Sequence, residues 1–143
     1  MFEIKKLNED VVLPKYESKQ AAGMDVHAYL DDSVIIVPTQ RVLIPTGLFM
    51  ALEPGYELQI RPRSGLAYKN GITVLNSPGT IDSDYRGEIK ILLINHGLES
   101  FTIDNGMRIA QIIINKVEQV QFKEVDELSD TDRGSGGFGS TGI

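Results

Sequence analysis

Closely spaced turn signals divide the chain into short pieces, and this spacing constrains the fold more than any other feature. Glycine or proline marks each turn, at Glu53-Pro54-Gly55, Asn70-Gly71, Ser77-Pro78-Gly79, Asn95-His96-Gly97 and Asp104-Asn105-Gly106. The intervening runs are rich in β-branched and aromatic residues, which predicts strands over residues 33–37, 41–44, 47–52, 56–61, 88–94, 101–103 and 109–122. The pattern indicates an all-β sandwich, jelly roll or barrel.

Local periodicity supports this fold class. Tyr56, Leu58 and Ile60 alternate with polar residues, so they are expected to share one face of a half-buried strand. Helical spacing is not sustained for three turns in any window. The sequence predicts one short helix over residues 65–70, with Ser64 as its cap.

Composition limits the classes of partner and site. The 143 residues, 41% of them hydrophobic and 24% charged, suit one globular domain. A net charge of −6 argues against binding of polymeric nucleic acid. The chain has no cysteine and two histidines, so any metal is expected to have oxygen ligands. No apolar run is long enough for a membrane span and no signal peptide is evident, so we expect a soluble, cytoplasmic protein without membrane contact.

Arginines beside turns or small polar residues suggest a local anion site. Five of the six are placed in this way: Arg61, Arg63, Arg86, Arg108 and Arg133. Residues 61–67 combine a strand end, a potential helix start and guanidinium groups, which suits phosphate. The alternative is a set of capped turns and surface ion pairs.

A second polar cluster lies in residues 79–87. Asp82, Asp84 and Tyr85 occur together there, and a carboxylate in such a loop can deprotonate water. The alternative is an Asx turn, and spacing alone does not decide between the two aspartates.

Single polar residues remain ambiguous at this level. Asn76 suits a nucleobase edge or a hairpin, and Gln111 suits a buried network or a ligand contact. Asp25 suits the water shell of a cation or a loop cap. His27 and His96 are predicted to be a strand and a turn residue without catalytic roles.

The end of the sequence is rich in glycine. Residues 132–143 contain five glycines, which predicts either a disordered tail or a mobile arm that orders around a ligand.

Five segments, taken in order, resemble the five motifs of the trimeric dUTPases. They are residues 22–26, 61–67, 76–87, 108–111 and 133–142, so the resemblance spans nearly the whole chain. It implies an all-β, jelly-roll-like (β-clip) subunit with one short helix, in a homotrimer with shared active sites. It further implies a β-domain over residues 1–128 and a flexible arm over residues 129–143 that closes a neighbouring subunit's site.

The same resemblance implies the reaction and the nucleoside contacts. dUTP would be cleaved between its α and β phosphorus atoms with Mg²⁺, which limits uracil in DNA and supplies dUMP for dTMP synthesis. Asp82 would activate the attacking water, so the resemblance favours it over Asp84. Tyr85 would lie against the deoxyribose and exclude a 2′-hydroxyl, while Asn76 would bind the uracil edge.

The remaining family roles concern the triphosphate. Those implied for phosphate contacts in the β-domain are Arg63, Ser64, Gly65 and Gln111. Asp25 would face the hydrated metal through water. In the arm, the substrate-binding residues would be Arg133, Ser140 and Thr141 at the γ-phosphate, Phe138 stacked on uracil, and Gly139.

One departure and two alternatives accompany the resemblance. Met107 stands where the family commonly has an acidic residue, so the support of Arg108 is expected to differ. The dCTP deaminases share the fold but use a glutamate as proton shuttle, where this chain has Leu92. The other alternative is a non-catalytic β-module that binds dUTP for regulation.

Overall fold

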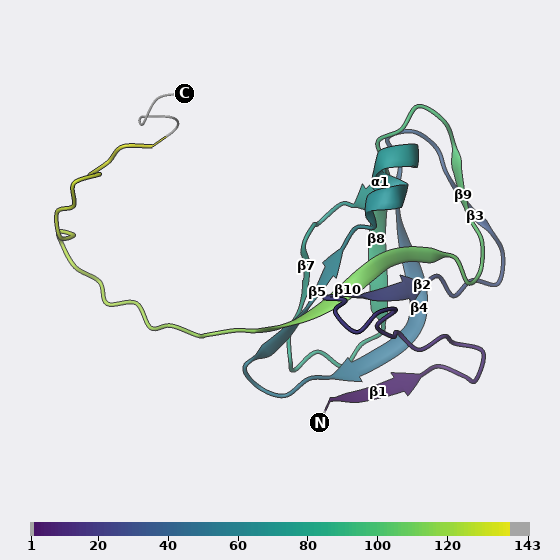
Figure 1. Cartoon of the computed structure of the whole chain (residues 1–143), viewed down its shortest axis with the longest axis horizontal. Coiled ribbons are helices and arrows are strands. Elements are labelled where there is room, and N and C mark those ends of the chain that lie inside the picture. Colours follow the sequence, from purple (N-terminus) through teal and green to yellow (C-terminus); the bar gives the residue numbers. More distant parts are fainter. Residues whose placement is uncertain (1, 138–143) are drawn as a thin grey trace.

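The computed structural model describes residues 2–137 as a β-rich body with a long extension (Figure 1). The strands are β1 (Glu3–Lys6), β2 (Met24–His27), β3 (Val34–Ile36), β4 (Arg41–Ala51), β5 (Tyr56–Arg61), β6 (Ile72–Val74), β7 (Gly79–Ile81), β8 (Ile89–Asn95), β9 (Phe101–Ile103) and β10 (Arg108–Lys116), and the helix is α1 (Ser64–Asn70). The predicted all-β class with one short helix is thus confirmed for these residues.

The strands form three antiparallel sheets. Their orders are β1-β4-β8-β6, β2-β10-β5-β7 and β3-β9. Aliphatic side chains fill the space between the two larger sheets, and Ile44, Leu58, Ile91, Leu93 and Ile112 are completely buried. Burial of this apolar surface is the main stabilising contribution to the fold.

The long strand β4 replaces two predicted strands. The residues Pro45-Thr46-Gly47 read as a break in the sequence, yet the strand continues through them. Its pairing with β8 shifts register between Pro45 and Leu48, and the buried Thr46 hydroxyl donates to the carbonyl of Ile89 at 2.6 Å. A bulge stabilised by a side-chain bond therefore accommodates the turn-like residues.

The start of α1 also differs from expectation. Ser64 is its first residue, and Arg63 is the N-cap, without a side-chain capping bond. The first helical bond runs from the Ala67 N–H to the Arg63 carbonyl at 3.1 Å. Since Ser64 already lies inside the helix, its predicted capping role is wrong.

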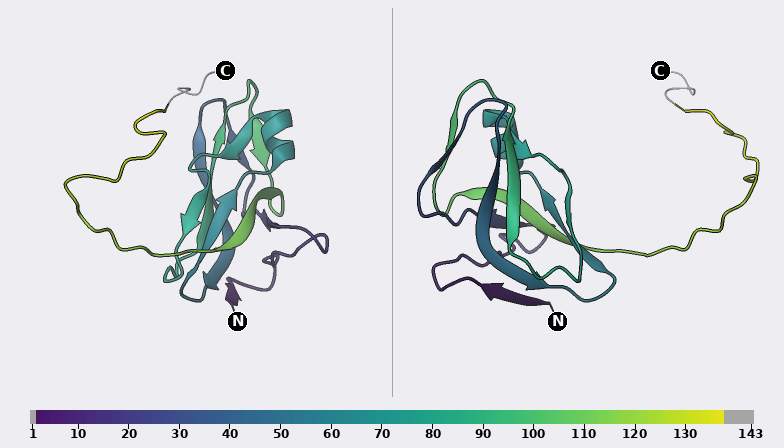
Figure 2. Two further views of the ribbon diagram at one scale, coloured as in Figure 1. Left: turned by 60° about the vertical axis from the view of Figure 1, so that its left-hand side comes forward. Right: turned by 180° about the vertical axis from the view of Figure 1, so that it is seen from behind.

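The chain leaves the body after β10. The strand predicted over residues 109–122 ends at Lys116, which pairs with Tyr56, the first residue of β5. Residues 118–137 then run away from the sheets in all three views (Figure 2). Within residues 2–137, no helix has the length and apolar character needed to cross a membrane.

Candidate active site

One cavity brings together three of the residues singled out in the sequence. Its volume is about 310 Å³, and we call it the loop cavity. Its lining consists of Leu43, Ile60, Asn76, Gly79, Thr80, Ile81, Asp82, Tyr85, Glu88, Lys90 and Leu92. An amide, a carboxylate and a phenol thus border the same concave space.

The position of Asp82 distinguishes it from Asp84. Both aspartates border a second cavity, of about 650 Å³, but only Asp82 also lines the loop cavity. Of the two aspartates, Asp82 is therefore the one that borders a ligand placed in the loop cavity.

Hydrogen bonds hold the loop that carries Asp82 and Tyr85. The Tyr85 N–H donates to the Asp82 carbonyl at 3.1 Å, and the Tyr85 hydroxyl donates to the Glu88 carbonyl at 3.0 Å. The Arg86 guanidinium bridges the carbonyls of Ser83 and Tyr85 at 2.7 and 2.8 Å. This arginine therefore stabilises the loop internally, in line with the turn-stabilising alternative.

Sequence reasoning did not single out Glu88 and Lys90 as part of this site. Glu88 accepts the Gly47 N–H at 2.9 Å, and its other carboxylate oxygen lies 3.6 Å from the Lys90 ammonium. The alternation along β8 could have indicated Lys90, because Ile89 and Ile91 are buried and Lys90 therefore lies on the opposite face of the strand. Leu92 shares that face, so an aliphatic side chain forms part of the cavity wall.

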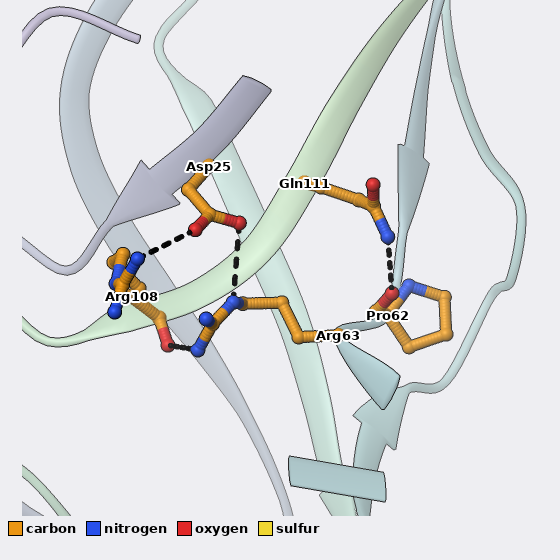
Figure 3. A network of polar contacts seen from close by, with 5 residues as sticks. All are labelled: Asp25, Pro62, Arg63, Arg108 and Gln111. Carbon is orange, nitrogen blue, oxygen red and sulfur yellow. Dashed lines mark hydrogen bonds and ion pairs between the residues drawn. The ribbon is translucent and has the colours of Figure 1, made fainter. Parts of the chain in front are cut away.

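A second polar cluster, the arginine network, joins Asp25, Arg63 and Arg108 (Figure 3). The Asp25 carboxylate accepts from Arg63 Nε at 3.1 Å and from Arg108 Nη1 at 3.2 Å. Arg63 Nη1 also donates to the Arg108 carbonyl at 3.2 Å. The Asp25 side chain is only 20% exposed, so this carboxylate fixes both guanidinium groups from a sheltered position.

The network explains how Arg108 is supported beside Met107. The sequence led us to expect altered support, because an acidic neighbour is missing from the chain at Met107. In the structure the carboxylate comes from β2 instead, through Asp25, while Met107 packs against the apolar core.

Gln111 lies next to the network on β10. Its Nε2 donates to the Pro62 carbonyl at 3.0 Å, so it links β10 to the segment before α1 (Figure 3). A Cβ atom at Gly23 would collide with the Gln111 side-chain oxygen, so the glycine leaves space for this amide. Gln111 therefore has a backbone partner in the structure, and its phosphate contact stays a prediction.

His27 lies beside the same charges. It is a residue of β2, as predicted, and its Nδ1 is buried without a hydrogen-bond partner among the described residues. Burial lowers the pKa of His27 by desolvation; the Asp25 charge opposes this shift, while Arg108 and Arg63 add to it. His27 is therefore favoured in its neutral form.

The loop cavity and the arginine network are separate within the described chain. None of Asp25, Arg63 and Gln111 lines the loop cavity, and Ser64 and Gly65 are exposed at the start of α1. Arg133 donates to the Gly136 carbonyl at 2.9 Å within the extension. The predicted contacts at Phe138, Gly139, Ser140 and Thr141 lie outside the described residues.

Comparisons with known proteins agree on one family. A family model described as dUTPase matches residues 9–142. The chain is 63% identical over 139 residues to the deoxyuridine 5′-triphosphate nucleotidohydrolase of Nautilia profundicola, covering 97% of this chain and 96% of that one.

Solved structures of dUTPases share the fold. The dUTPase of Staphylococcus bacteriophage 80alpha with dUPNHPP has a TM-score of 0.87 at 26% identity, covering 100% of this chain and 99% of that chain. A mutant dUTPase of phage phi11 of S. aureus, described with a structural Mg(II) ion, has a TM-score of 0.79 at 21% identity, covering 91% and 99%. At that lower identity the likeness supports the fold alone.

Proposed function

The chain belongs to the dUTPase family and hydrolyses dUTP, and from this premise we propose which of its residues carry out the reaction. The reaction consumes one water and yields dUMP and pyrophosphate. The observation that carries the residue assignment is the meeting of Asn76, Asp82 and Tyr85 in the loop cavity. Leu92 in the cavity wall argues against deamination, because a hydrocarbon side chain cannot transfer protons.

Asp82 is the proposed general base. Its carboxylate takes a proton from a water that attacks the α-phosphorus, while the bond to the β-phosphate breaks and pyrophosphate leaves. The bond between the Tyr85 N–H and the Asp82 carbonyl fixes this residue relative to the sugar-binding side of the loop. Such fixed placement lowers the entropic cost of reaching the reactive geometry.

Asn76 and Tyr85 are the proposed selectivity residues. The Asn76 amide offers a donor and an acceptor, which matches the adjacent carbonyl and N–H of uracil. A base with the wrong polarity leaves buried groups unpaired and binds weakly. The Tyr85 ring lies against the deoxyribose and leaves no room for a 2′-hydroxyl.

The phosphate contacts belong to the other cluster. We assign them to Arg63, Ser64, Gly65 and Gln111. Asp25 already holds the Arg63 guanidinium in the structure, so little conformational entropy is lost when a phosphate binds it. Because this cluster does not line the loop cavity, we propose that different subunits of a homotrimer supply the two parts of each site.

The end of the chain is the proposed closing element. We assign residues 1–128 to the β-domain and residues 129–143 to an arm that closes the site of a neighbouring subunit. Arg133, Ser140 and Thr141 would contact the γ-phosphate, with Phe138 stacked on uracil and Gly139 beside it. Closure of this kind excludes bulk water from the reacting phosphorus.

Mg²⁺ fits the available donors as an ion carried by the triphosphate. In the part of the chain that the structure describes, no three His, Asp or Glu side chains gather to hold a metal. Mg²⁺ commonly keeps several waters and binds through phosphates and one or two carboxylates. Asp25 would face its water shell, and the bound ion would neutralise charge on the phosphates.

Pyrophosphate release with Mg²⁺ and dUTP, dCTP, dTTP or UTP tests this assignment. The parent protein is expected to act on dUTP, and Asp82→Asn to lose about 10²- to 10⁴-fold in turnover while still binding dUTP. Asp84→Asn, in the same loop, is the matched control and should remain active. Ammonia release from dCTP would indicate a deaminase, and dUTP binding without turnover in the parent would indicate a regulatory module.

A further inference from the structure

The ring of Tyr85 occupies the space above Gly87. A Cβ atom built at Gly87 would collide with the Tyr85 hydroxyl oxygen, and would lie 2.5 Å from Cζ and 2.9 Å from Cε2 of the ring. Gly87 is not among the glycines with positive φ, so its backbone conformation is open to other residues. The need for glycine at this position is therefore steric and arises from Tyr85.

The far end of the ring has a defined partner. The Tyr85 hydroxyl donates to the Glu88 carbonyl at 3.0 Å, which requires the ring to fold back over Gly87. Glu88 is itself anchored, since its carboxylate accepts the Gly47 N–H of β4 at 2.9 Å. The hydroxyl thus attaches the ring to a segment tied to the neighbouring strand.

The backbone that carries the ring is restrained as well. The Tyr85 N–H bonds the Asp82 carbonyl at 3.1 Å, and the Tyr85 carbonyl accepts from Arg86 at 2.8 Å. The backbone that carries the ring and the hydroxyl at its far end are therefore both held, and the missing Cβ of Gly87 leaves room for the ring.

We propose that Gly87 is a positioning residue that sets the discrimination between deoxyribonucleotides and ribonucleotides. The proposal rests on the function proposed above, in which Tyr85 excludes the 2′-hydroxyl. Exclusion by lack of space works only if the excluding wall stays in place. A side chain at residue 87 would displace the Tyr85 ring and break its bond to Glu88. The ring would then no longer exclude the 2′-hydroxyl of a ribose.

The test compares kcat/KM for dUTP and UTP in Gly87→Ala. We expect the ratio of dUTP to UTP to fall about tenfold or more, the scale at which a small change in a binding pocket acts. Ser83→Ala, a change in the same loop that adds no atom, is the control and should leave the ratio unchanged. An equal loss for both nucleotides would mean a structural role only and would overturn the proposal.

Two further variants separate this inference from the function on which it rests. If Tyr85→Ala leaves the ratio unchanged, the proposed role of Tyr85 itself fails. If Tyr85→Ala lowers the ratio and Gly87→Ala does not, only the inference about Gly87 fails. If each single variant lowers the ratio, adding Gly87→Ala to Tyr85→Ala should lower it no further, because the two changes act through one ring.

Thermal unfolding of each variant shows whether the fold is retained. If Gly87→Ala does not fold, Tyr85→Phe provides the test, since it removes the bond to Glu88 and adds no atom. Its ratio of kcat/KM values should fall, but less than in Tyr85→Ala. An unchanged ratio in Tyr85→Phe would show that discrimination does not depend on a fixed ring position, and this would overturn the proposal.

Discussion

At the scale of single residues, Asp25 shows how one carboxylate can prepare an anion site. It accepts from Arg63 Nε and Arg108 Nη1, and Arg63 Nη1 also donates to the Arg108 carbonyl, so the two guanidiniums are held by some of their donors. Arginine presents five donors in a rigid fork, so fixing one edge orients the other. The structure thus places Asp25 against both arginines, beside its proposed role near Mg²⁺.

Asp25→Asn tests this orienting role. The amide keeps the size of the side chain but loses the charge that attracts both guanidiniums, so phosphate binding should weaken. We expect kcat/KM for dUTP to fall about 10- to 100-fold, the effect of losing a charge-assisted bond. Asp31→Asn, at an exposed aspartate, is the control for kcat/KM, and equal values in both variants would contradict the role.

His27 predicts a pH dependence of stability. Its folded-state pKa lies below the ordinary value of about 6.5, so below that pH the unfolded chain takes up the proton first. The stability present above about pH 6.5 is therefore lost as the pH falls toward the folded-state pKa. His27→Gln should lose less stability than the parent between pH 7 and pH 5 in thermal unfolding scans. Parallel curves for the two proteins would exclude His27 as the cause.

At the scale of elements, strands with clear alternation or flanking turns could be predicted, whereas four short strands could not. The bounds of β5 and β9 match the sequence prediction, because alternation or flanking turns define them. The strands β1, β2, β6 and β7 were missed: each has only three or four residues, and β2 contains Asp25 and His27. Such strands depend on pairing with a neighbour more than on their own propensity.

The register of β10 explains why the arginine network could not be foreseen. Gln111 pairs with Asp25 of β2 on one side and with Arg61 of β5 on the other. This double pairing brings Asp25 near Arg63, although 38 positions separate them in the chain. Motif resemblance identified both residues, but their direct contact depends on strand pairing that local patterns do not reveal.

Gly71 at the end of α1 provides a test at this scale. Its φ is +68°, and a Cβ there would lie 2.8 Å from the Gly97 Cα and 2.9 Å from the His96 carbonyl carbon. Gly106 also has a positive φ, of +78°, but nothing lies near its added Cβ.

Gly106→Ala should cost about 1–2 kcal/mol from the left-handed conformation alone. Gly71→Ala should cost more, because a backbone clash adds to the same strain. Denaturant unfolding gives the free energy of unfolding of both variants. Equal losses would show that the close contact with Gly97 does not affect stability.

At the scale of the whole molecule, the separation of the loop cavity from the arginine network predicts complementation. Asp82→Asn and Arg63→Ala should each be inactive alone. If different subunits supply the two parts, mixed trimers formed by unfolding and refolding the variants together should recover activity at about a quarter of the sites on random mixing. Lack of recovery, with mixing verified by a mass tag, would place both parts of a site on one subunit.

If the reaction centre is divided between chains as proposed, turnover is also subject to mass action. Diluting the protein until its copies separate would leave folded chains that each hold an incomplete set of groups. Specific activity should then fall with protein concentration, and saturating substrate should oppose the fall by joining the copies together. Under the proposed division, the enzyme's own abundance would become one of the variables that set its rate.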